Sequence, residues 1–322
     1  MRFLIVHNAK AGFGSDAIFA FERALLKGGD ECVMRVIGDT LPSLDALSDA
    51  EDFDRVIVSG GDGTETSMLY QLRNRAVRTC IFPSGTANLL FANLGNAPEP
   101  SAIARACRAG RTALCDLGEI SWTDRQGERR TRGFSLMSGT GYDADIMRAA
   151  LPNKQAMGEA AYFFAALTNP RPTVLSFRIK VDGKSYERNG IACLVANNAM
   201  MQGDIEIVPD SRMDDGLLDV IVLETSDAAQ LLRPLAAGIL DPSGHSVGRP
   251  FIENFQGRHV KVATSTPVPM QIDGEVISSQ INSYEARVLE RANELIVDRM
   301  SRYAKDGEET REETGEMAFP DA

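Results

Sequence analysis

Short apolar runs alternate with amphipathic stretches along the first third of the chain. The apolar runs have the length of buried strands and occupy residues 3–7, 32–37, 56–58 and 80–82. The amphipathic stretches follow them and occupy residues 17–26, 41–47, 64–72 and 87–94. This alternation predicts a mostly parallel sheet with helices on both faces, because each connecting helix covers one face of the sheet. Ligands of such sheets bind at the carboxyl ends of the strands.

The pattern changes after about residue 115, where strand-like segments predominate. They occupy residues 113–120, 131–137, 174–181, 191–195, 217–223, 260–263 and 268–272. Two helices are predicted among them, over residues 157–167 and 226–240, and the second contains Pro234 and begins at a capping Ser226. These segments predict a β-rich sandwich or distorted barrel. The apolar residues 294–297 are expected to return to the first sheet.

The predicted fold class is α/β plus β. A three-layer α/β domain with a mostly parallel sheet is expected over residues 1–115, completed by residues 290–302, and a β-rich sandwich domain over residues 116–290. One domain with a large insertion is the alternative, although 322 residues exceed the size at which single cores usually stop growing. Residues 303–322 are predicted to be an acidic, disordered tail.

Composition narrows the classes of partner. The net charge of -11 opposes binding to nucleic acids, whose backbones are also negative. The five cysteines form no metal-binding or disulfide pattern, and none of the three histidines is spaced as a paired zinc ligand. No signal peptide or spanning apolar run is found, so a cytoplasmic protein is expected. A homodimer remains open.

The strongest local feature is a glycine-rich turn after the third apolar run, with the sequence Ser59-Gly60-Gly61-Asp62-Gly63-Thr64. Glycines let backbone amides approach a ligand closely, and the following helix adds partial positive charge at its N-terminus, so phosphate is the expected ligand. The turn is not a Walker A loop, because no Gly-Lys-Ser/Thr follows. A tight strand-to-helix turn without a ligand is the structural alternative.

Two further turns are predicted at the same edge of the sheet. One is Pro83-Ser84-Gly85-Thr86-Ala87-Asn88, and the other is the first loop, residues 7–15, which contains glycines and one lysine. Together these loops could bind one polyphosphate. Ordinary helix capping by Thr86 and Asn88 is the alternative interpretation.

A pair of carboxylates stands far downstream in Asp273-Gly274-Glu275, after an alternating strand. Paired carboxylates suit a general base or a neighbour of a metal ion. Asp-Gly is also a common hairpin turn, so the local signal is modest.

The order of these motifs resembles the diacylglycerol kinase catalytic-domain family, which includes bacterial diacylglycerol kinases and sphingosine kinases. The resemblance spans residues 2–300. Besides the motifs described above, it rests on residues 139–144 and 213–219. It implies an ATP-dependent and Mg²⁺-dependent lipid kinase that binds its nucleotide between the α/β domain and the β-rich domain. The acceptor would be diacylglycerol or a related lipid.

The resemblance also implies roles for individual residues. Asp62 would belong to the water and magnesium network near the phosphates, and Glu275, with Asp273 beside it, would form the catalytic acidic element, with the choice of base left open. A structural magnesium site would use Asp215 with the backbone carbonyls of Arg212 and Leu217, unless this segment is only a turn. The residues implied to contact the nucleotide are Asn8, Gly12, Thr40, Gly60, Gly61, Gly63, Thr64 and Thr86.

The chain departs from the family at several positions. Glu65-Thr66-Ser67 stands where the family commonly has x-Asn-Glu, and Asn88-Leu89 stands where Asn-Asp is usual. Ala9 and Ala11 replace a proline and a serine. These changes motivate a second hypothesis, a catalytically impaired lipid- or nucleotide-binding regulator. A soluble-metabolite kinase of the NAD-kinase type is the third, because it shares the first glycine loop.

A lipid kinase needs access to lipid. Residues 122–132 contain four arginines and the only tryptophan, a composition compatible with transient contact with an anionic membrane surface, such as the inner membrane face. A solvated hairpin is the favoured interpretation of this segment. The apolar residues 160–167 could line an acyl-chain cleft, although a buried helix is the commoner use of such a segment.

Overall fold

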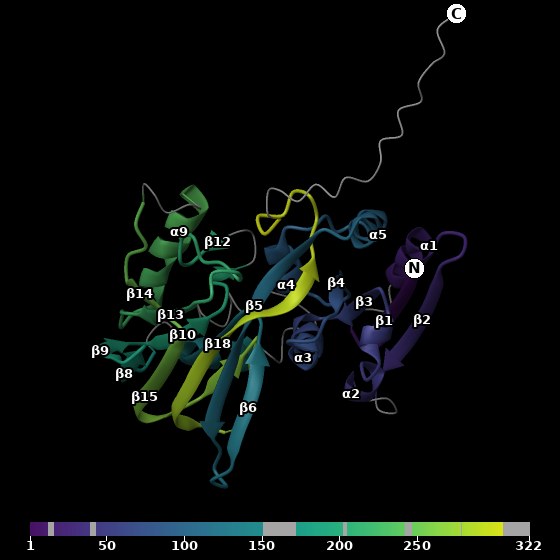
Figure 1. Ribbon diagram of the computed structural model, residues 1–322. Coiled ribbons are helices and arrows are strands. Elements are labelled where there is room, and N and C mark those ends of the chain that lie inside the picture. Colours follow the sequence, from purple (N-terminus) through teal and green to yellow (C-terminus); the bar gives the residue numbers. More distant parts are fainter. Residues whose placement is uncertain are drawn as a thin grey trace, which may run out of the picture.

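The computed structural model describes residues 1–11, 16–38, 43–150, 172–201, 205–241, 247–277 and 279–304. Figure 1 shows two parts that share one long sheet. The predicted helix over residues 157–167 and the predicted nucleotide contacts Gly12 and Thr40 lie outside the described residues. None of the helices within these ranges combines the length and apolar content needed to cross a bilayer.

The N-terminal part begins with four parallel strands in the order β2-β1-β3-β4. Their bounds are β1 Arg2–Asn8, β2 Glu31–Ile37, β3 Arg55–Gly60 and β4 Arg78–Pro83. The helical segments between and after them are α1 Ala17–Leu25, α2 Ser43–Ala46, η1 Ala50–Asp52, α3 Asp62–Leu72, α4 Leu89–Leu94 and α5 Pro100–Ala109. The predicted parallel sheet is therefore confirmed.

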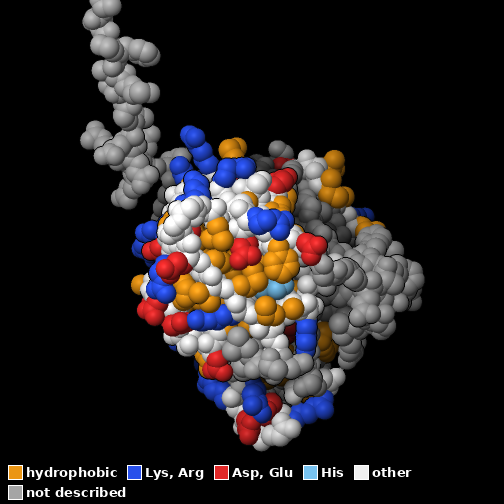
Figure 2. Space-filling model, turned by 90° about the vertical axis from the view of Figure 1, so that its right-hand side faces the viewer, with side chains coloured by type: hydrophobic (Ala, Val, Ile, Leu, Met, Phe, Trp, Pro, Cys, Tyr) orange, Lys and Arg blue, Asp and Glu red, His pale blue; other side chains and the backbone are white. Residues whose placement is uncertain are grey.

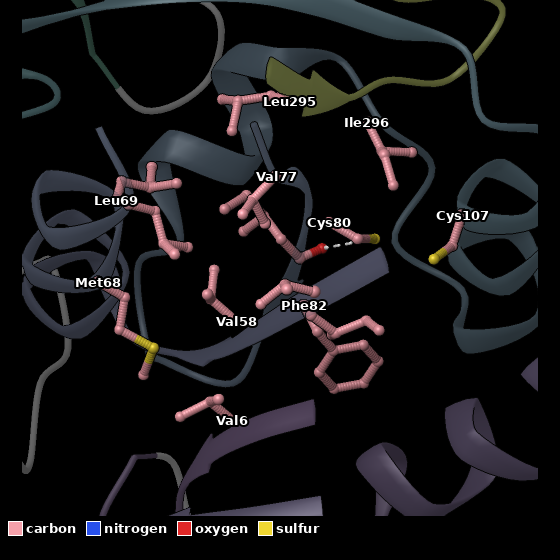
Figure 3. Packing of buried hydrophobic residues seen from close by; sticks show 14 of the residues in the cluster. Val6, Val58, Met68, Leu69, Val77, Cys80, Phe82, Cys107, Leu295 and Ile296 are labelled. Carbon is pink, nitrogen blue, oxygen red and sulfur yellow. Dashed lines mark hydrogen bonds between the residues drawn. The ribbon is translucent and has the colours of Figure 1, made fainter. Parts of the chain in front are cut away.

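Helices cover both faces of this sheet because successive strand residues point in opposite directions. Phe82 of β4 packs on Phe21 of α1, with 4.9 Å between ring centroids. Figure 3 shows Met68 and Leu69 of α3 on one side of the strands and Phe82 with Cys107 of α5 on the other. The N-terminal part is thus a three-layer α/β structure.

The last strand, β18 (Ile281–Ile296), joins the two parts of the chain. Glu294 and Leu295 pair in parallel with β4, while the strand pairs in antiparallel with β5 (Thr112–Thr123) and β15 (His259–Val268). The long sheet is completed by β6 Arg129–Phe134, β8 Leu175–Val181 and β9 Lys184–Gly190. The expected return of residues 294–297 to the first sheet is therefore observed as strand pairing.

A second sheet faces the distal half of the long sheet, in the order β14-β13-β10-β7-β16-β17. Its strands are β7 Met137–Gly141, β10 Ala192–Ala196, β13 Leu218–Leu223, β14 Ile252–Gly257, β16 Met270–Ile272 and β17 Glu275–Val276. Phe177 and Val262 of the long sheet share a buried core with Val195 and Val220 of the second sheet. The predicted β-rich sandwich is therefore confirmed. A short ribbon of β11 (Met200–Met201) and β12 (Ile205–Glu206) stands apart from both sheets.

The outer face of the second sheet carries α6 (Tyr142–Ala150), η3 (Ala228–Leu231) and α9 (Leu232–Leu240). The prediction of one helix beginning at Ser226 was wrong. The side chain of Asp227 caps η3 by accepting a hydrogen bond from the amide of Ala229. Pro234 lies in the first turn of α9, where its missing N–H costs no helical hydrogen bond.

The predicted strand over residues 131–137 is also divided, into β6 and β7, which lie in different sheets. The chain crosses between the sheets at Ser135 and Leu136. Their backbone amides donate to the carboxylate of Asp273 instead of to a neighbouring strand. This crossing is the structural basis of the acidic corner described below.

Candidate active site

The loop after β1 is tied to the glycine-rich turn after β3. The side-chain amide of Asn8, the last residue of β1, donates to the hydroxyl of Thr64 over 2.8 Å. The carbonyl oxygen of the same side chain accepts from the amide of Lys10 over 3.0 Å. Two of the loops predicted to lie together are therefore in direct contact.

The glycine-rich turns after β3 and β4 pack backbone against backbone. The amide of Ser84 donates to the carbonyl oxygen of Gly60 over 2.8 Å. A Cβ on Gly85 would lie 2.5 Å from the Cα of Gly61, a separation that no side chain tolerates. Glycine is therefore required here by the contact between the turns, independently of any ligand.

Asp62 and Asn88 fix the entrance to α4 in an unexpected way. The carboxylate of Asp62 accepts from the amide of Leu90 over 2.9 Å, so it caps α4 from a neighbouring helix. Asn88 has a φ of 49° and binds Gly85 through both side-chain atoms, at 2.7 and 3.0 Å. Its side chain closes the turn and does not cap the helix. Thr86 is exposed at the tip of the same turn.

A hydrogen-bonded row runs across the strand ends below these turns, and no pattern in the sequence indicates it. The hydroxyl of Ser59 lies 2.9 Å from Nδ1 of His7 and 2.8 Å from the hydroxyl of Ser84. Burial lowers the pKa of His7, which favours the neutral ring. The row links β1 and β3 to the turn after β4 without adding a charge to the edge.

The acidic corner is a two-residue hairpin between β16 and β17. Its central residues, Asp273 and Gly274, both have positive φ, 45° and 80°, as this type of tight turn requires. Asp273 accepts five hydrogen bonds, at 2.8 to 3.2 Å. The donors are the Thr66 hydroxyl, the Ser135 amide and hydroxyl, and the amides of Leu136 and Met137.

These contacts saturate the carboxylate of Asp273, because a carboxylate offers about four lone-pair positions. Burial raises the pKa of Asp273, and the hydrogen bonds from Ser135 and Thr66 oppose that rise. Asp273 thus holds the crossing between β6 and β7 against α3, and it presents no free oxygen to a substrate.

Glu275, two residues later, is placed differently. A Cβ on Gly63 would lie only 2.8 Å from Oε1 of Glu275, so this carboxylate oxygen rests against the first turn of α3. Oε2 accepts from Nη2 of Arg132 over 2.8 Å, and the Glu275 side chain is 58% exposed. The structure therefore brings Glu275 to the Gly60–Thr64 turn with one oxygen directed at it.

The carboxyl group of Asp143 supports the hairpin through Gln271. Gln271 accepts from the amide of Gly274 over 2.7 Å and donates to Oδ2 of Asp143 over 2.8 Å. Burial raises the pKa of Asp143 to about 6, and the hydrogen bond from Gln271 opposes this. A Cβ on Gly139 would lie 1.8 Å from the same oxygen, which explains a glycine there. The segment 139–144 thus supports the acidic corner.

Asp215 lies in the turn before β13, beside Asp116 of β5. Its Oδ1 accepts from the amide of Leu217 over 2.9 Å, and Asp116 accepts from the amide of Gly216 over 2.7 Å. Burial, with Asp219 and Asp116 nearby, raises the pKa of Asp215 to about 6. The side chain of Arg212 pairs with Asp214.

The oxygen atoms of this turn show whether it suits Mg²⁺. In the ranges that the structure describes, no three His, Cys, Asp or Glu side chains converge as metal ligands, so backbone carbonyls would be needed. The raised pKa values of Asp215 and Asp116 reflect buried negative charge that a divalent cation would offset. A carboxylate with carbonyl oxygens is a hard-ligand set that fits Mg²⁺.

The residues that depart from the family pattern have distinct environments. Thr66 reaches the acidic corner, where its hydroxyl lies 2.6 Å from that of Ser135 and donates to Asp273 over 2.8 Å. Glu65 faces elsewhere and is fully buried, and neither of its carboxyl oxygens has a hydrogen-bond partner among the described residues. Burial first, and the charge of Asp62 second, raise the pKa of Glu65 well above its ordinary value.

Two family domains match this architecture. Residues 2–120 match the diacylglycerol kinase catalytic domain, and residues 137–297 match the YegS C-terminal NAD kinase beta sandwich-like domain. A diacylglycerol kinase of Staphylococcus carnosus (strain TM300) is 25% identical over 280 residues, which cover 84% of this chain and 81% of that protein. A diacylglycerol kinase of Mycobacterium tuberculosis (strain ATCC 25618 / H37Rv) is 29% identical over 191 residues, covering 58% and 60%.

Solved structures show the same fold. A crystal structure of a diacylglycerol kinase from Bacillus anthracis str. Sterne superposes with a TM-score of 0.64 at 16% identity, covering 92% of this chain and 97% of that one. Another crystal structure from that organism gives 0.71 at 18% identity with the same coverage. The chain belongs to the diacylglycerol kinase catalytic-domain family.

Proposed function

We propose that this chain is a lipid kinase that transfers the γ-phosphate of ATP to a lipid hydroxyl, with diacylglycerol or a related lipid as the acceptor. The observation that supports it most strongly is the contact between Glu275 and the first turn of α3, where a Cβ on Gly63 would meet Oε1 at 2.8 Å. A phosphate bound by the Gly60–Thr64 turn would lie beside this carboxylate. Phosphoryl transfer requires that proximity of base, acceptor and phosphate.

Glu275 is the proposed general base. It is exposed, and its only ion pair among the described residues is the single contact with Arg132, so an acceptor hydroxyl can reach it. Asp273 is proposed as the positioning carboxylate, because all of its acceptor positions are used by Thr66, Ser135 and the following amides. Its role is to hold the hairpin that carries Glu275.

The nucleotide is proposed to bind along the edge formed by Asn8, Gly60, Gly61, Gly63 and Thr64. The amides at the N-terminus of α3 would bind phosphate oxygens, and the helix dipole favours negative charge there. Thr86, exposed on the neighbouring turn, is a further proposed contact. A magnesium ion, when bound, supplies charge neutralisation at the phosphates. Asp62 is proposed to belong to the water and magnesium network there. The Asp215 turn is proposed to hold a separate, structural magnesium ion.

The decisive experiment follows labelled γ-phosphate from ATP into a panel of acceptors, namely diacylglycerol, a sphingoid base, ceramide and NAD. Wild-type protein should label a lipid, and Glu275→Gln should lose most of this activity while binding ATP normally. Asp62 and the turns are unchanged in that variant, so ATP binding serves as its control. If Glu275→Gln turns over at the wild-type rate, the assignment of the base fails.

An NAD-kinase-like activity is the second candidate, favoured by the match of residues 137–297 to a domain described as NAD kinase beta sandwich-like. Labelled NADP instead of labelled lipid would establish it. A regulator without turnover is the third candidate. The hydroxyl of Thr66 is bonded within the acidic corner, which weakens the case that this departure disables the site.

A further inference from the structure

A cavity of about 640 Å³ lies beside Glu275, between the hairpin that joins β5 to β6 and the end of β17. Val276 and Ile277, next to Glu275 in the chain, form part of its wall. Its charged lining residues are Asp124, Arg125, Arg130 and Arg132. The lining thus contains three positive side chains and one negative side chain, whereas the whole chain has a net charge of -11.

The single acid of the cavity is already neutralised. Asp124 accepts from Arg130 over 2.7 Å and from the amides of Gln126 and Glu128 at 2.9 and 3.0 Å within its turn. Arg125 makes no ion pair with any described residue, and Arg132 makes only the pair with Glu275 among them. The guanidinium groups of Arg125 and Arg132 can therefore bind an anionic ligand in the cavity.

The face of the molecule on the side of the N-terminal strands shows no such concentration of one sign. Figure 2 shows this face, where acidic and basic side chains are mixed among apolar ones. The large apolar side chains exposed on this part of the chain include Val33, Val36 and Phe19. The cavity lined by arginines lies next to Glu275, the proposed general base, where the acceptor lipid must bind.

We propose that this cavity binds the phosphate group of an anionic acceptor lipid, whose nearby head-group hydroxyl then reaches Glu275. This inference rests on the proposed lipid kinase function and specifies the acceptor as a phosphate-bearing lipid. Arg125 and Arg132 bind the phosphate oxygens, since the guanidinium fork matches phosphate in a bidentate geometry. The apolar wall of Val276 and Ile277 contacts the adjoining carbon atoms.

Arg132 has a second part in this arrangement, as a positioning residue. Its pair with Glu275 is one nitrogen-to-oxygen contact between side chains that are 42% and 58% exposed, and such pairs contribute little free energy. A phosphate in the cavity competes for the same guanidinium with stronger, paired hydrogen bonds. Binding of the acceptor thus draws Arg132 from Glu275 and leaves that carboxylate for the hydroxyl proton.

The chemical step balances without a further reactant. The head-group oxygen forms a bond to the γ-phosphorus, and the bond from that phosphorus to the bridging oxygen of ADP breaks. ADP leaves with the electron pair, and the hydroxyl proton passes to Glu275. The product is a lipid with one additional phosphate monoester.

The test compares phosphatidylglycerol with neutral dioleoylglycerol as acceptors in the same detergent micelles, by kcat/KM. Arg125→Ala and Arg132→Ala should each lower the phosphatidylglycerol-to-dioleoylglycerol ratio by about fivefold or more, the effect of about one cation near an anionic lipid. Arg132→Lys keeps the charge without the fork and should restore part of the ratio. Arg299→Ala removes an exposed cation elsewhere and should leave the ratio unchanged.

Inorganic phosphate is the second probe. Competitive inhibition against phosphatidylglycerol that disappears in Arg125→Ala would support the cavity as the phosphate site. A different result would be that inorganic phosphate binds there, dioleoylglycerol is the better acceptor, and no variant alters the phosphatidylglycerol-to-dioleoylglycerol ratio. In that case the cavity binds free phosphate, and the assignment of a phosphate-bearing lipid is overturned. Phosphorylation of neutral lipid alone overturns this inference and leaves the kinase function standing, whereas labelling of no lipid despite ATP binding overturns that function as well.

Discussion

Glu275 and Gly63 are in contact across the two parts of the chain. Oε1 of Glu275 occupies the space that a Cβ on Gly63 would need, with 2.8 Å between the two positions. Gly63 lies in the first turn of α3, and Glu275 begins β17. The absence of a side chain at Gly63 thus admits the carboxylate of the β-rich part to the Gly60–Thr64 turn.

Gly63→Ala should lower kcat without lowering stability. The added methyl displaces the Glu275 carboxylate, and misplacement of a reacting group by about 1 Å can reduce a rate about a hundredfold. Alanine is favoured over glycine within a helix by about 0.5–1 kcal/mol, so Tm should stay the same or rise. Single-turnover kinetics and thermal unfolding measure the two effects. A variant with full activity would contradict the contact.

The matched control for that variant is Gly38→Ala. Gly38 follows β2, is exposed, and has no atom within 4 Å of a built Cβ. It should therefore keep both the rate and Tm. A comparable loss of rate in Gly38→Ala would mean that the effect of Gly63→Ala is nonspecific.

Asp273→Asn and Glu275→Gln should separate structure from chemistry. The amide introduced by Asp273→Asn would turn an NH₂ group toward donors that now bind a carboxylate oxygen, leaving at least two of them unsatisfied. Each such donor costs about 1–3 kcal/mol, so urea unfolding should show a loss of about 2 kcal/mol or more. Glu275→Gln should have the unfolding free energy of wild type, and its kcat should fall by a factor of about 10²–10⁴. Equal stability losses in both variants would refute the assignment.

The hydroxyl of Thr66 should matter more than its methyl group. Thr66→Val is nearly isosteric but removes the donor to Asp273 and the partner of Ser135, so it should cost about 1–3 kcal/mol of unfolding free energy and also lower kcat. Thr66→Ser keeps the hydroxyl and should retain the rate. If Thr66→Val is as active and as stable as Thr66→Ser, this hydroxyl does not support the corner.

The fold could be predicted from the sequence where local pattern determines structure. The strands that end at Asn8, Gly60 and Pro83 are short apolar runs followed by glycine-bearing turns, and parallel pairing brings such turns to one edge. The pair Asp273-Gly274 indicates a hairpin, because it suits two successive positive φ angles. These features depend on neighbours in the chain, which the sequence displays.

The different roles of the two hairpin carboxylates could not be predicted in the same way. Asp273 is saturated because Ser135, Leu136 and Met137 leave one sheet for the other at that point, and their pairing depends on the tertiary fold. The cap on η3 is Asp227 and not Ser226 for a similar reason, since one residue of register decides which side chain meets the amide. Polar residues at sheet crossings carry no periodic signal.

The buried Glu65 should make the protein less stable as pH rises. Its pKa in the folded protein lies well above the ordinary value of 4.5, because burial and the charge of Asp62 disfavour the carboxylate. At a pH below 4.5 the folded and unfolded states both hold the proton. Above 4.5 the unfolded state releases it and the folded state does not, so the unfolded state is favoured increasingly until the folded pKa is reached.

Glu65→Gln removes this titration and keeps the side-chain shape. Relative to wild type, its unfolding free energy should be similar at about pH 4 and should gain about 1.4 kcal/mol per pH unit above 4.5, up to the folded pKa. Urea unfolding from about pH 4 to about pH 8 measures the difference. Glu187→Gln, which replaces an exposed acid on β9, is the control variant measured over the same pH range. Parallel pH profiles for wild type and Glu65→Gln would mean that Glu65 is ionised in the folded protein, and that a cation or a rearranged donor accompanies it.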